Sequence, residues 1–233
     1  MNYDDSIKIK RIFNRISYRY DFLNNLLSFG LHNLWKRRLI RLLEPLNGES
    51  WADLCCGTGD MALLIIKRVI PNGKIVGIDN ANDILEIAKI KSKEFDQKNI
   101  SWKKMDIFDL DPKKSKYDGI CMSYGLRNLI NVEEGLYKVF SLLNENGRAG
   151  FLDFNHAPEK SLQSIFQKLY LRFVVVPISK IFSLKEEYNY IEKSIKSFPF
   201  KSQLIYMAKK IGYKDIIYKK ICGGQMFMLV LKK

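Results

Sequence analysis

The chain has 233 residues, 47% of them hydrophobic, which suffices for a single α/β domain with a sizeable core. No apolar stretch approaches the roughly 18 residues that cross a membrane, and the N-terminus lacks the apolar core of a signal peptide, so we expect a cytoplasmic protein. The formal net charge of +14 comes mostly from scattered lysines, without the Arg clusters of a nucleic-acid footprint. We expect no nucleic-acid partner; composition is the favoured explanation of the charge, and attraction to an anionic membrane surface is the alternative.

The first two thirds of the chain predict helices followed by alternating strands and helices. Residues 5–44 carry helical apolar spacing broken near Gly30, which indicates two or more helices before the sheet. The expected strands are Ser50–Cys55, Lys74–Asp79, Ile100–Lys103, Tyr117–Ser123 and Arg148–Phe154. The expected helices follow Gly59 through Val69, run from Asn82 to about Phe95, and span Val132–Leu143. This alternation predicts a parallel, doubly wound sheet.

The last third of the chain has a different pattern. Residues 158–190 read as mostly helical, Phe200–Ile211 as a helix closed by Gly212, and Tyr213–Ile221 with Met226–Leu231 as a terminal strand pair. We therefore expect one domain over residues 1–233. Its expected parts are an N-terminal helical cap (1–47), a cofactor-binding core (48–156), a helical lid or substrate region (157–200), and a C-terminal helix and strand pair (201–233).

The turn after the first expected strand reads DLCCGTGD, residues 53–60. Gly57 and Gly59 permit a tight turn and let the chain pass against a bulky ligand, at the point where doubly wound sheets approach their ligands most closely. Asp79 ends the second expected strand, where a carboxylate can accept hydrogen bonds from both hydroxyls of a ribose. A solvated strand-end aspartate is the alternative interpretation of Asp79.

A nucleotide-like cofactor is the interpretation that this spacing favours. Asp106 follows the third expected strand, where its side chain can bind an adenine amino group while an apolar neighbour packs on the ring. Ala62 occupies the third glycine position of the dinucleotide fingerprint, and the relaxed pattern tolerates alanine, so glycine spacing alone leaves a nicotinamide cofactor open. Asp53, which begins the loop, would lie beneath the glycine turn and orient it.

The cysteines predict neither a metal site nor a disulfide framework. The chain has four cysteines without CxxC spacing and two histidines. Cys55 and Cys56 are expected to be small, buried residues at the end of a strand.

Four stretches resemble the ubiquinone/menaquinone C-methyltransferase family, known as the UbiE or MenG type. Residues 20–35, YDFLNNLLSFGLHNLW, match its N-terminal signature YDxxNxxxSxGxHxxW, and residues 53–60 match its DxxxGTGD cofactor loop. Residues 123–128, SYGLRN, match its SFGLRN segment, and residues 190–199 match its YxxxSIxxFP run. The resemblance spans nearly the whole chain.

The resemblance implies a Rossmann-like class I fold, with a seven-stranded, mostly parallel sheet that ends in an antiparallel hairpin. It also implies S-adenosylmethionine as cofactor and C-methylation of a polyprenylated quinol ring, with demethylmenaquinol favoured and the ubiquinone-pathway benzoquinol as the alternative. The cofactor contacts that it implies, together with the glycine loop, are Asp53, Gly57, Thr58, Gly59, Asp79, Asp106, Ile107 and Ser123.

Two residues are candidates for the chemistry of this reaction. Arg127, which stays charged at any working pH, would support the quinol oxyanion directly or through a water; pairing with a nearby carboxylate is the alternative. His32 would be the general base, and a packed core histidine is the alternative. Tyr20, Asn24 and Trp35 of the N-terminal signature would lie over the cofactor and meet the substrate.

Residues 162–182 form an apolar stretch that would make a lid or tunnel for the isoprenoid tail, or else ordinary core or a homodimer interface. Surrounding lysines would favour peripheral contact with an anionic membrane.

The chain departs from the family pattern at Asn144–Gly147, where a lysine-proline-glycine-glycine turn is expected, and at Asp153, where the family has glutamate. The first change is neutral, because an Asn-Gly turn serves the same geometry. The second puts in doubt a role that needs the longer side chain.

Two other functions stay open. The chain could be another small-molecule or RNA methyltransferase, or it could be a cofactor-binding protein without catalytic activity. No NPPY-type segment follows the fourth expected strand, which disfavours N-methylation of nucleic acids.

Overall fold

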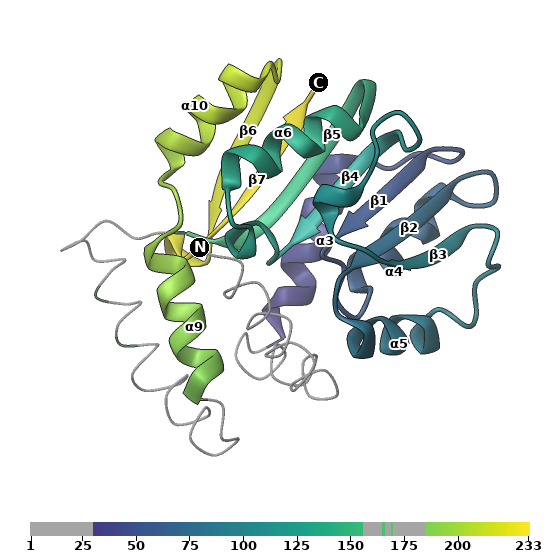
Figure 1. The fold of residues 1–233 in the computed structure, drawn as a ribbon, viewed down its shortest axis with the longest axis horizontal. Helices are drawn as coiled ribbons and strands as arrows, with labels where there is room; N and C mark the ends of the chain where they lie inside the picture. Colours follow the sequence, from purple (N-terminus) through teal and green to yellow (C-terminus); the bar gives the residue numbers. More distant parts are fainter. Residues whose placement is uncertain (1–29, 156–164, 166–168, 170–184) are drawn as a thin grey trace.

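A computed structural model describes residues 30–155, 165, 169 and 185–233 (Figure 1). Its centre is a seven-stranded sheet in the order β3-β2-β1-β4-β5-β7-β6, in which β7 pairs antiparallel with β5 and β6, and the other pairs are parallel. The strands are β1 (Ser50–Leu54), β2 (Lys74–Asp79), β3 (Ile100–Lys104), β4 (Tyr117–Ser123), β5 (Leu143–Phe154), β6 (Asp215–Ile221) and β7 (Met226–Lys232). The predicted mostly parallel sheet with its terminal antiparallel hairpin is confirmed.

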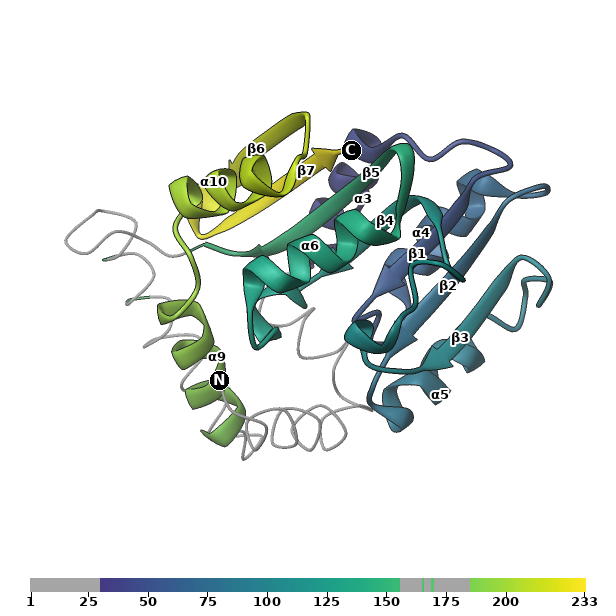
Figure 2. The same ribbon diagram turned by 45° about the horizontal axis from the view of Figure 1, so that its top comes forward.

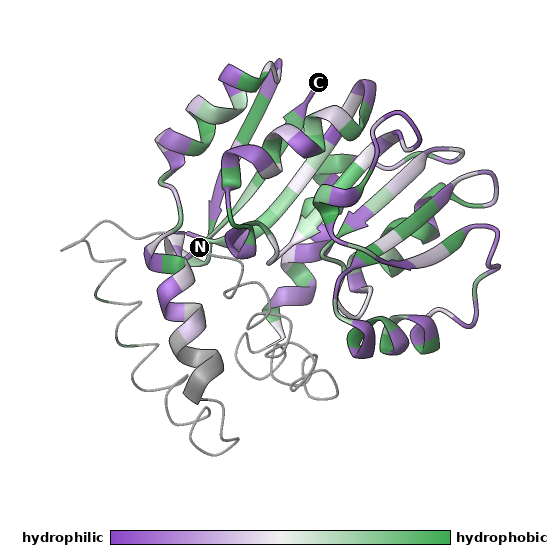
Figure 3. Cartoon of the chain, viewed as in Figure 1, coloured by the Kyte–Doolittle hydropathy of each residue, from purple (hydrophilic) through white to green (hydrophobic). Residues whose placement is uncertain are grey.

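Helices cover both faces of this sheet (Figure 2). One buried cluster joins α3 and α4 to the sheet, and a second joins α6 and α10 to its other face. Figure 3 shows the hydrophobic residues concentrated on the strands and on the inner helix faces, with hydrophilic residues outside. The helices are α3 (Leu31–Leu43), α4 (Asp60–Val69), α5 (Asn82–Lys91), α6 (Val132–Leu142), α9 (Lys185–Lys196) and α10 (Lys201–Ile211).

The largest differences from the predicted bounds have local causes. α5 ends four residues early, because Ser92 Oγ bonds the Lys89 carbonyl at 3.0 Å and accepts the Trp102 indole N–H at 2.9 Å. β5 begins at Leu143 rather than Arg148, because Leu143 already pairs with Tyr117 before the register shifts. Of the predicted lid (157–200), residues 157–164, 166–168 and 170–184 lie outside the described residues, as do the helices expected before Gly30. None of the described helices is long and apolar enough to cross a membrane.

Arg148 fixes the end of α3 against the sheet. Its guanidinium lies 5.0 Å from the Trp51 ring, donates to the carbonyls of Leu43 and Glu44, and binds both carboxylate oxygens of Glu49 at 2.9 Å. The orphan carbonyls at the C-terminus of α3 are thereby satisfied by a charged group that the helix dipole favours. α3, which carries part of the N-terminal signature, is therefore anchored at its far end.

Trp102 of β3 supports the glycine loop from below. Its ring lies beside Gly59 and Gly77, where a Cβ at either position would overlap it. Gly59 also has φ +80°, a left-handed conformation that costs a side chain about 1–2 kcal/mol. Two constraints therefore favour glycine at position 59: the left-handed backbone conformation and the close approach of the Trp102 indole.

We predict that Gly59→Ala lowers the free energy of unfolding by more than Gly48→Ala does. Gly48 has φ +91° but open space around its Cβ position, so it reports the backbone cost alone. Urea unfolding should give about 1–2 kcal/mol for Gly48→Ala and a further ~1–3 kcal/mol for Gly59→Ala, from overpacking against Trp102. Equal losses would show that the indole does not constrain the loop.

Asp53 joins β1 to α4 from inside the core. Its carboxylate, 1% exposed, accepts the Ala62 N–H at 3.0 Å and the Cys121 S–H at 3.3 Å. Burial raises the pKa of Asp53 from 3.8 to about 7, even though both hydrogen bonds oppose that change. In the unfolded chain this carboxyl ionises near its ordinary value, so unfolding releases a proton between about pH 4 and 7.

We therefore expect the wild-type protein to lose stability relative to Asp53→Asn as the pH rises from 4 to 7, by up to about 1.4 kcal/mol per unit. Above pH 7 the difference should become constant, because Asp53 is then ionised in both states. Urea unfolding of both proteins across this range measures it. A pH-independent difference for Asp53→Asn contradicts the assignment.

Candidate functional site

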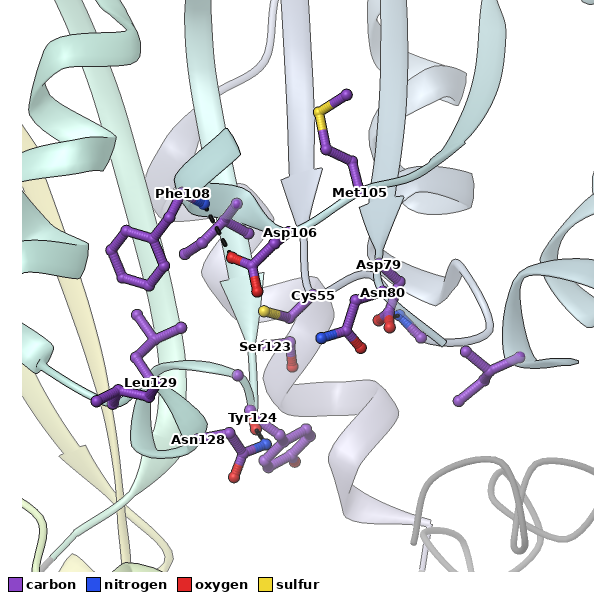
Figure 4. Close-up of a pocket in the computed structure, with 15 residues that line it drawn as sticks. Cys55, Asp79, Asn80, Met105, Asp106, Phe108, Ser123, Tyr124, Asn128 and Leu129 are labelled. Atoms are coloured by element: carbon purple, nitrogen blue, oxygen red, sulfur yellow. Dashed lines mark hydrogen bonds between the residues drawn. The ribbon is translucent and has the colours of Figure 1, made fainter. Parts of the chain in front are cut away.

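A cavity opens at the carboxyl ends of β1, β2 and β4, at the position where the strand order reverses between β1 and β4 (Figure 4). Doubly wound sheets bind their ligands at such a switch point. Five of the predicted cofactor residues line this cavity, namely Gly57, Asp79, Asp106, Ile107 and Ser123. Thr58, Gly59 and Asp53 are buried and do not line it.

Asp79 connects the end of β2 to the glycine loop. One carboxylate oxygen accepts the Gly57 N–H at 2.9 Å, and the other accepts the Ala81 N–H at 3.0 Å. Burial raises the pKa of Asp79, while its backbone hydrogen bonds lower it. A carboxylate offers about four acceptor positions, and the backbone of Gly57, Asn80 and Ala81 uses three, so the side chain can shape the loop and still accept a hydrogen bond from a ligand hydroxyl.

The two cysteines of the loop lie in different surroundings. Cys56 is buried, as predicted, whereas Cys55 is half-buried, has φ +53° and lines the cavity. Burial, and then the carboxylates of Asp79 and Asp106, raise the pKa of the Cys55 thiol well above its ordinary value. Cys55 is therefore a neutral thiol at physiological pH rather than a nucleophile.

Asp106 caps the short helix η2 (Ile107–Asp109) through the Phe108 N–H at 3.0 Å. Lys138 of α6 holds the same turn from behind, donating to the carbonyls of Phe108 and Leu110 at 2.8 and 2.9 Å. Met105, Ile107 and Phe108 give this side of the cavity an apolar lining beside the Asp106 carboxylate. A flat heteroaromatic ring with a polar edge suits such a wall.

The segment after β4 forms the opposite wall. Ser123 Oγ is buried and has no hydrogen-bond partner within the described residues. Tyr124 follows with φ +62°, and its carbonyl accepts from Arg127 Nη1 at 2.8 Å and from Asn128 Nδ2 at 3.2 Å. A buried hydroxyl without a partner at a cavity wall is satisfied most simply by a polar ligand.

Arg127 and Asp153 form a buried ion pair behind this wall. Arg127 Nη1 lies 2.7 Å from Asp153 Oδ1, the Arg127 backbone N–H donates to Oδ2 at 3.1 Å, and the guanidinium carbon is 5.1 Å from the Phe154 ring centroid. Aspartate at position 153 thus reaches Arg127 directly despite its shorter side chain. Arg127 is not among the residues that line the cavity, so contact with a substrate oxyanion stays a prediction.

A second charged cluster lies behind the glycine loop. Asp60 binds Lys36 of α3 at 2.8 Å and Lys91 of α5 at 2.7 Å, and Lys91 also donates to Thr58 Oγ1 at 3.2 Å. Although burial raises it, the pKa of Asp60 is lowered by the two ammonium groups to about 2. The predicted residue Thr58 is thus held in place by a lysine that sequence reasoning missed.

The candidate residues of the N-terminal signature are only partly described. His32 lies in the first turn of α3 and is 3% exposed, and Trp35 is half-buried against the core beneath α3. Neither lines the cavity, and Tyr20 and Asn24 lie outside the described residues. Their roles stay predictions.

The arrangement fits a nucleoside-containing cofactor. It offers an acceptor carboxylate for hydroxyl groups (Asp79), a glycine turn that passes close to the ligand (Gly57), an apolar wall with a polar edge, and an unsatisfied hydroxyl (Ser123). Sequence reasoning missed the other lining residues, among them Asn80, Ile84, Phe108 and Asn128. The one feature of the sequence that could have identified these residues is their position shortly after the ends of the predicted strands.

Comparisons with known proteins agree with this geometry. The chain is 37% identical over 227 residues, 97% of its length and 99% of the relative's, to a 2-phytyl-1,4-naphtoquinone methyltransferase of Nostoc sp.. It is 35% identical over 219 residues, 93% of its length and 86% of the relative's, to a demethylmenaquinone methyltransferase of Lactococcus lactis. A solved structure, that of the plantazolicin methyltransferase BpumL in complex with SAH, superposes with a TM-score of 0.62 at 17% identity, covering 97% of this chain and 96% of that one.

The structural likeness supports the Rossmann-like class I methyltransferase fold. The profile of the ubiE/COQ5 methyltransferase family matches residues 1–231. The cofactor is accordingly S-adenosylmethionine, in agreement with the fit of the cavity to a nucleoside. With this match over nearly its whole length, and with two quinone methyltransferases above 30% identity, the chain belongs to the ubiE/COQ5 methyltransferase family.

Proposed function

We propose that the protein methylates a ring carbon of a reduced 2-polyprenyl-1,4-naphthoquinone, with demethylmenaquinol favoured. The observation that carries this proposal is the similarity, over at least 93% of the chain, to two methyltransferases whose names specify such substrates. A phytyl tail is an alternative to the polyprenyl tail, and a benzoquinol is an alternative to the naphthoquinol ring. Demethylmenaquinol methylation is the final step of menaquinone biosynthesis.

Different residues of the cavity would bind the cofactor and the quinol. Asp79, Gly57, Asp106, Ile107 and Ser123 would hold S-adenosylmethionine, which supplies an electrophilic methyl group when bound. The quinol would lie on the β4 side, toward Tyr124 and Asn128, because the β1 and β2 ends are taken by the cofactor contacts. Holding both partners in one cavity, with the reacting atoms aligned, would be the larger part of such catalysis.

The quinol ring carbon is a poor nucleophile until the adjacent hydroxyl loses its proton and pushes electron density into the ring. We propose that Arg127 stabilises the resulting oxyanion, directly or through a water, and that His32 is the base. A guanidinium fixed by Asp153 and the Tyr124 carbonyl needs no reorganisation when the charge develops, which supports the role proposed for Arg127.

Residues 162–182 are proposed to cover the isoprenoid tail, with peripheral contact to an anionic membrane and homodimer formation as further proposals. They rest on the sequence pattern, because this stretch lies mostly outside the described residues. A cytoplasmic protein that touches the inner membrane from one side would meet such a substrate without crossing the bilayer.

The substrate assignment predicts a clear ring preference. Purified protein with labelled S-adenosylmethionine should methylate a demethylated 2-polyprenyl-1,4-naphthoquinol with kcat/KM at least about tenfold above that for the matching benzoquinol, a difference worth roughly 1.4 kcal/mol. The oxidised naphthoquinone is the control and should not react, because it has no hydroxyl to deprotonate. Cofactor binding without transfer to any quinol would indicate a binding protein instead.

The role of Arg127 is best tested without leaving a buried charge unpaired. In the double variant Arg127→Gln/Asp153→Asn both charges are removed while hydrogen-bonding capacity is kept, so folding should survive. We expect turnover to fall about 100-fold or more, with cofactor affinity changed less than threefold. Turnover within threefold of the wild-type value would rule out electrostatic support by Arg127.

A further inference from the structure

The conformation of Tyr124 is unusual for its position. It has φ +62°, although its side chain favours a negative φ, and its half-buried ring lines the cavity. A residue keeps such a backbone conformation only where its surroundings impose it, and these positions concentrate at ligand sites. Neighbouring groups must therefore impose the left-handed conformation on Tyr124.

Three hydrogen bonds hold the Tyr124 peptide groups. Its N–H donates to the Leu152 carbonyl of β5 at 2.7 Å, and its carbonyl accepts from Arg127 Nη1 and from Asn128 Nδ2. The first two come from buried groups, Leu152 and the Arg127–Asp153 pair. The third depends on the side chain of Asn128, which is half-buried at the cavity wall.

The orientation of the Asn128 amide follows from its neighbours. A carbonyl only accepts, so the Tyr124 oxygen requires the Asn128 NH₂ group on its side. Asn128 Oδ1 then faces the Tyr190 hydroxyl of α9, which donates to it at 2.9 Å. The Tyr124 carbonyl therefore sets the orientation of the amide, and the Tyr190 hydroxyl holds the amide in place by donating to its other end.

Tyr190 itself lies on a helix anchored in the core. Ile195, five residues later on α9, is 6% exposed, and Phe198 just beyond the helix stacks on Phe227 with ring centroids 5.8 Å apart. The contact between α9 and η3 (Leu126–Asn128) thus joins a buried part of the C-terminal region to the cavity wall. The link runs from α9 through Asn128 to Tyr124.

We infer that Tyr190 is a positioning residue that, through Asn128, holds Tyr124 in its left-handed conformation, so that the Tyr124 ring forms the wall against which the methyl acceptor packs. This inference rests on the proposed function. The acceptor, rather than the cofactor, is the ligand concerned, because Tyr124 and Asn128 lie beyond Ser123, the last of the proposed cofactor contacts along the chain, and across the switch point from Asp79.

The test compares Tyr190→Phe with Tyr218→Phe in the full-length protein. Tyr218 makes a matched hydrogen bond to Asn155 Oδ1 at 3.0 Å, and neither residue lines the cavity. For Tyr190→Phe we expect KM for the naphthoquinol to rise about five- to tenfold, the effect of one lost hydrogen bond, with kcat and the Kd of S-adenosylmethionine within twofold. Tyr218→Phe should change none of the three.

Amide hydrogen exchange provides a readout independent of the substrate. Peptides covering residues 123–129 should exchange faster in Tyr190→Phe than in the wild-type protein, and not in Tyr218→Phe.

Unchanged exchange together with an unchanged KM in Tyr190→Phe would overturn the inference. A rise in KM that is equal in Tyr190→Phe and Tyr218→Phe would overturn it as well. Faster exchange in Tyr190→Phe, with a wild-type protein that methylates no quinol, would overturn the proposed function and the assignment of Tyr124 to the quinol, while retaining the link from Tyr190 to Tyr124. Asn128→Ala, which removes the middle of the link, should reproduce both changes if Tyr190→Phe fails to fold.

Discussion

The 2.9 Å hydrogen bond from the Gly57 N–H to the Asp79 carboxylate is the contact on which the site depends. It ties together the ends of two adjacent parallel strands, β1 and β2, at the edge of the sheet where the ligand cavity opens. The Trp102 ring packs against Gly59 of the loop, and Asp53 accepts the Ala62 N–H in the first turn of α4. Asp60, which follows the loop, forms ion pairs with Lys36 and Lys91. The glycine turn is thus shaped before any ligand arrives, so little ordering is required on binding.

The wall after β4 is stabilised by contacts between distant elements. Tyr124 has an unfavourable left-handed backbone conformation, and its carbonyl accepts hydrogen bonds from Arg127 and Asn128. Arg127 is in turn paired with Asp153 of β5, and Asn128 accepts a hydrogen bond from Tyr190 of α9. The contacts proposed for the cofactor follow the ends of β1 to β4, while the wall proposed for the acceptor also depends on Asp153 of β5 and Tyr190 of α9.

The sequence predicted the fold well, and it also predicted that Gly57 and Asp79 lie at the cavity, because both depend on local pattern. The bounds of β2 and β4 follow from apolar runs that end in turns, and Gly57 and Asp79 follow from their positions at strand ends. Trp102, Lys36 and Lys91 were missed, because their contacts join residues 24 to 43 positions apart. Arg127 was identified as a charge near the site, but its burial against Asp153, 26 positions away, required the register of β4 and β5. No sequence pattern links Tyr190 to Asn128 across 62 positions.

Asp79 is proposed to hold the glycine loop and to bind the ligand, and isothermal titration of S-adenosylmethionine into Asp79→Asn tests this most directly. The variant keeps the volume of the side chain but loses its charge and one of its acceptor oxygens. Affinity should fall about 30- to 100-fold, as expected when charged hydrogen bonds are lost, while Asp83→Asn, at an exposed position in the first turn of α5, should bind as the wild-type protein does. A folded Asp79→Asn variant that binds within twofold of the wild-type protein would contradict the account.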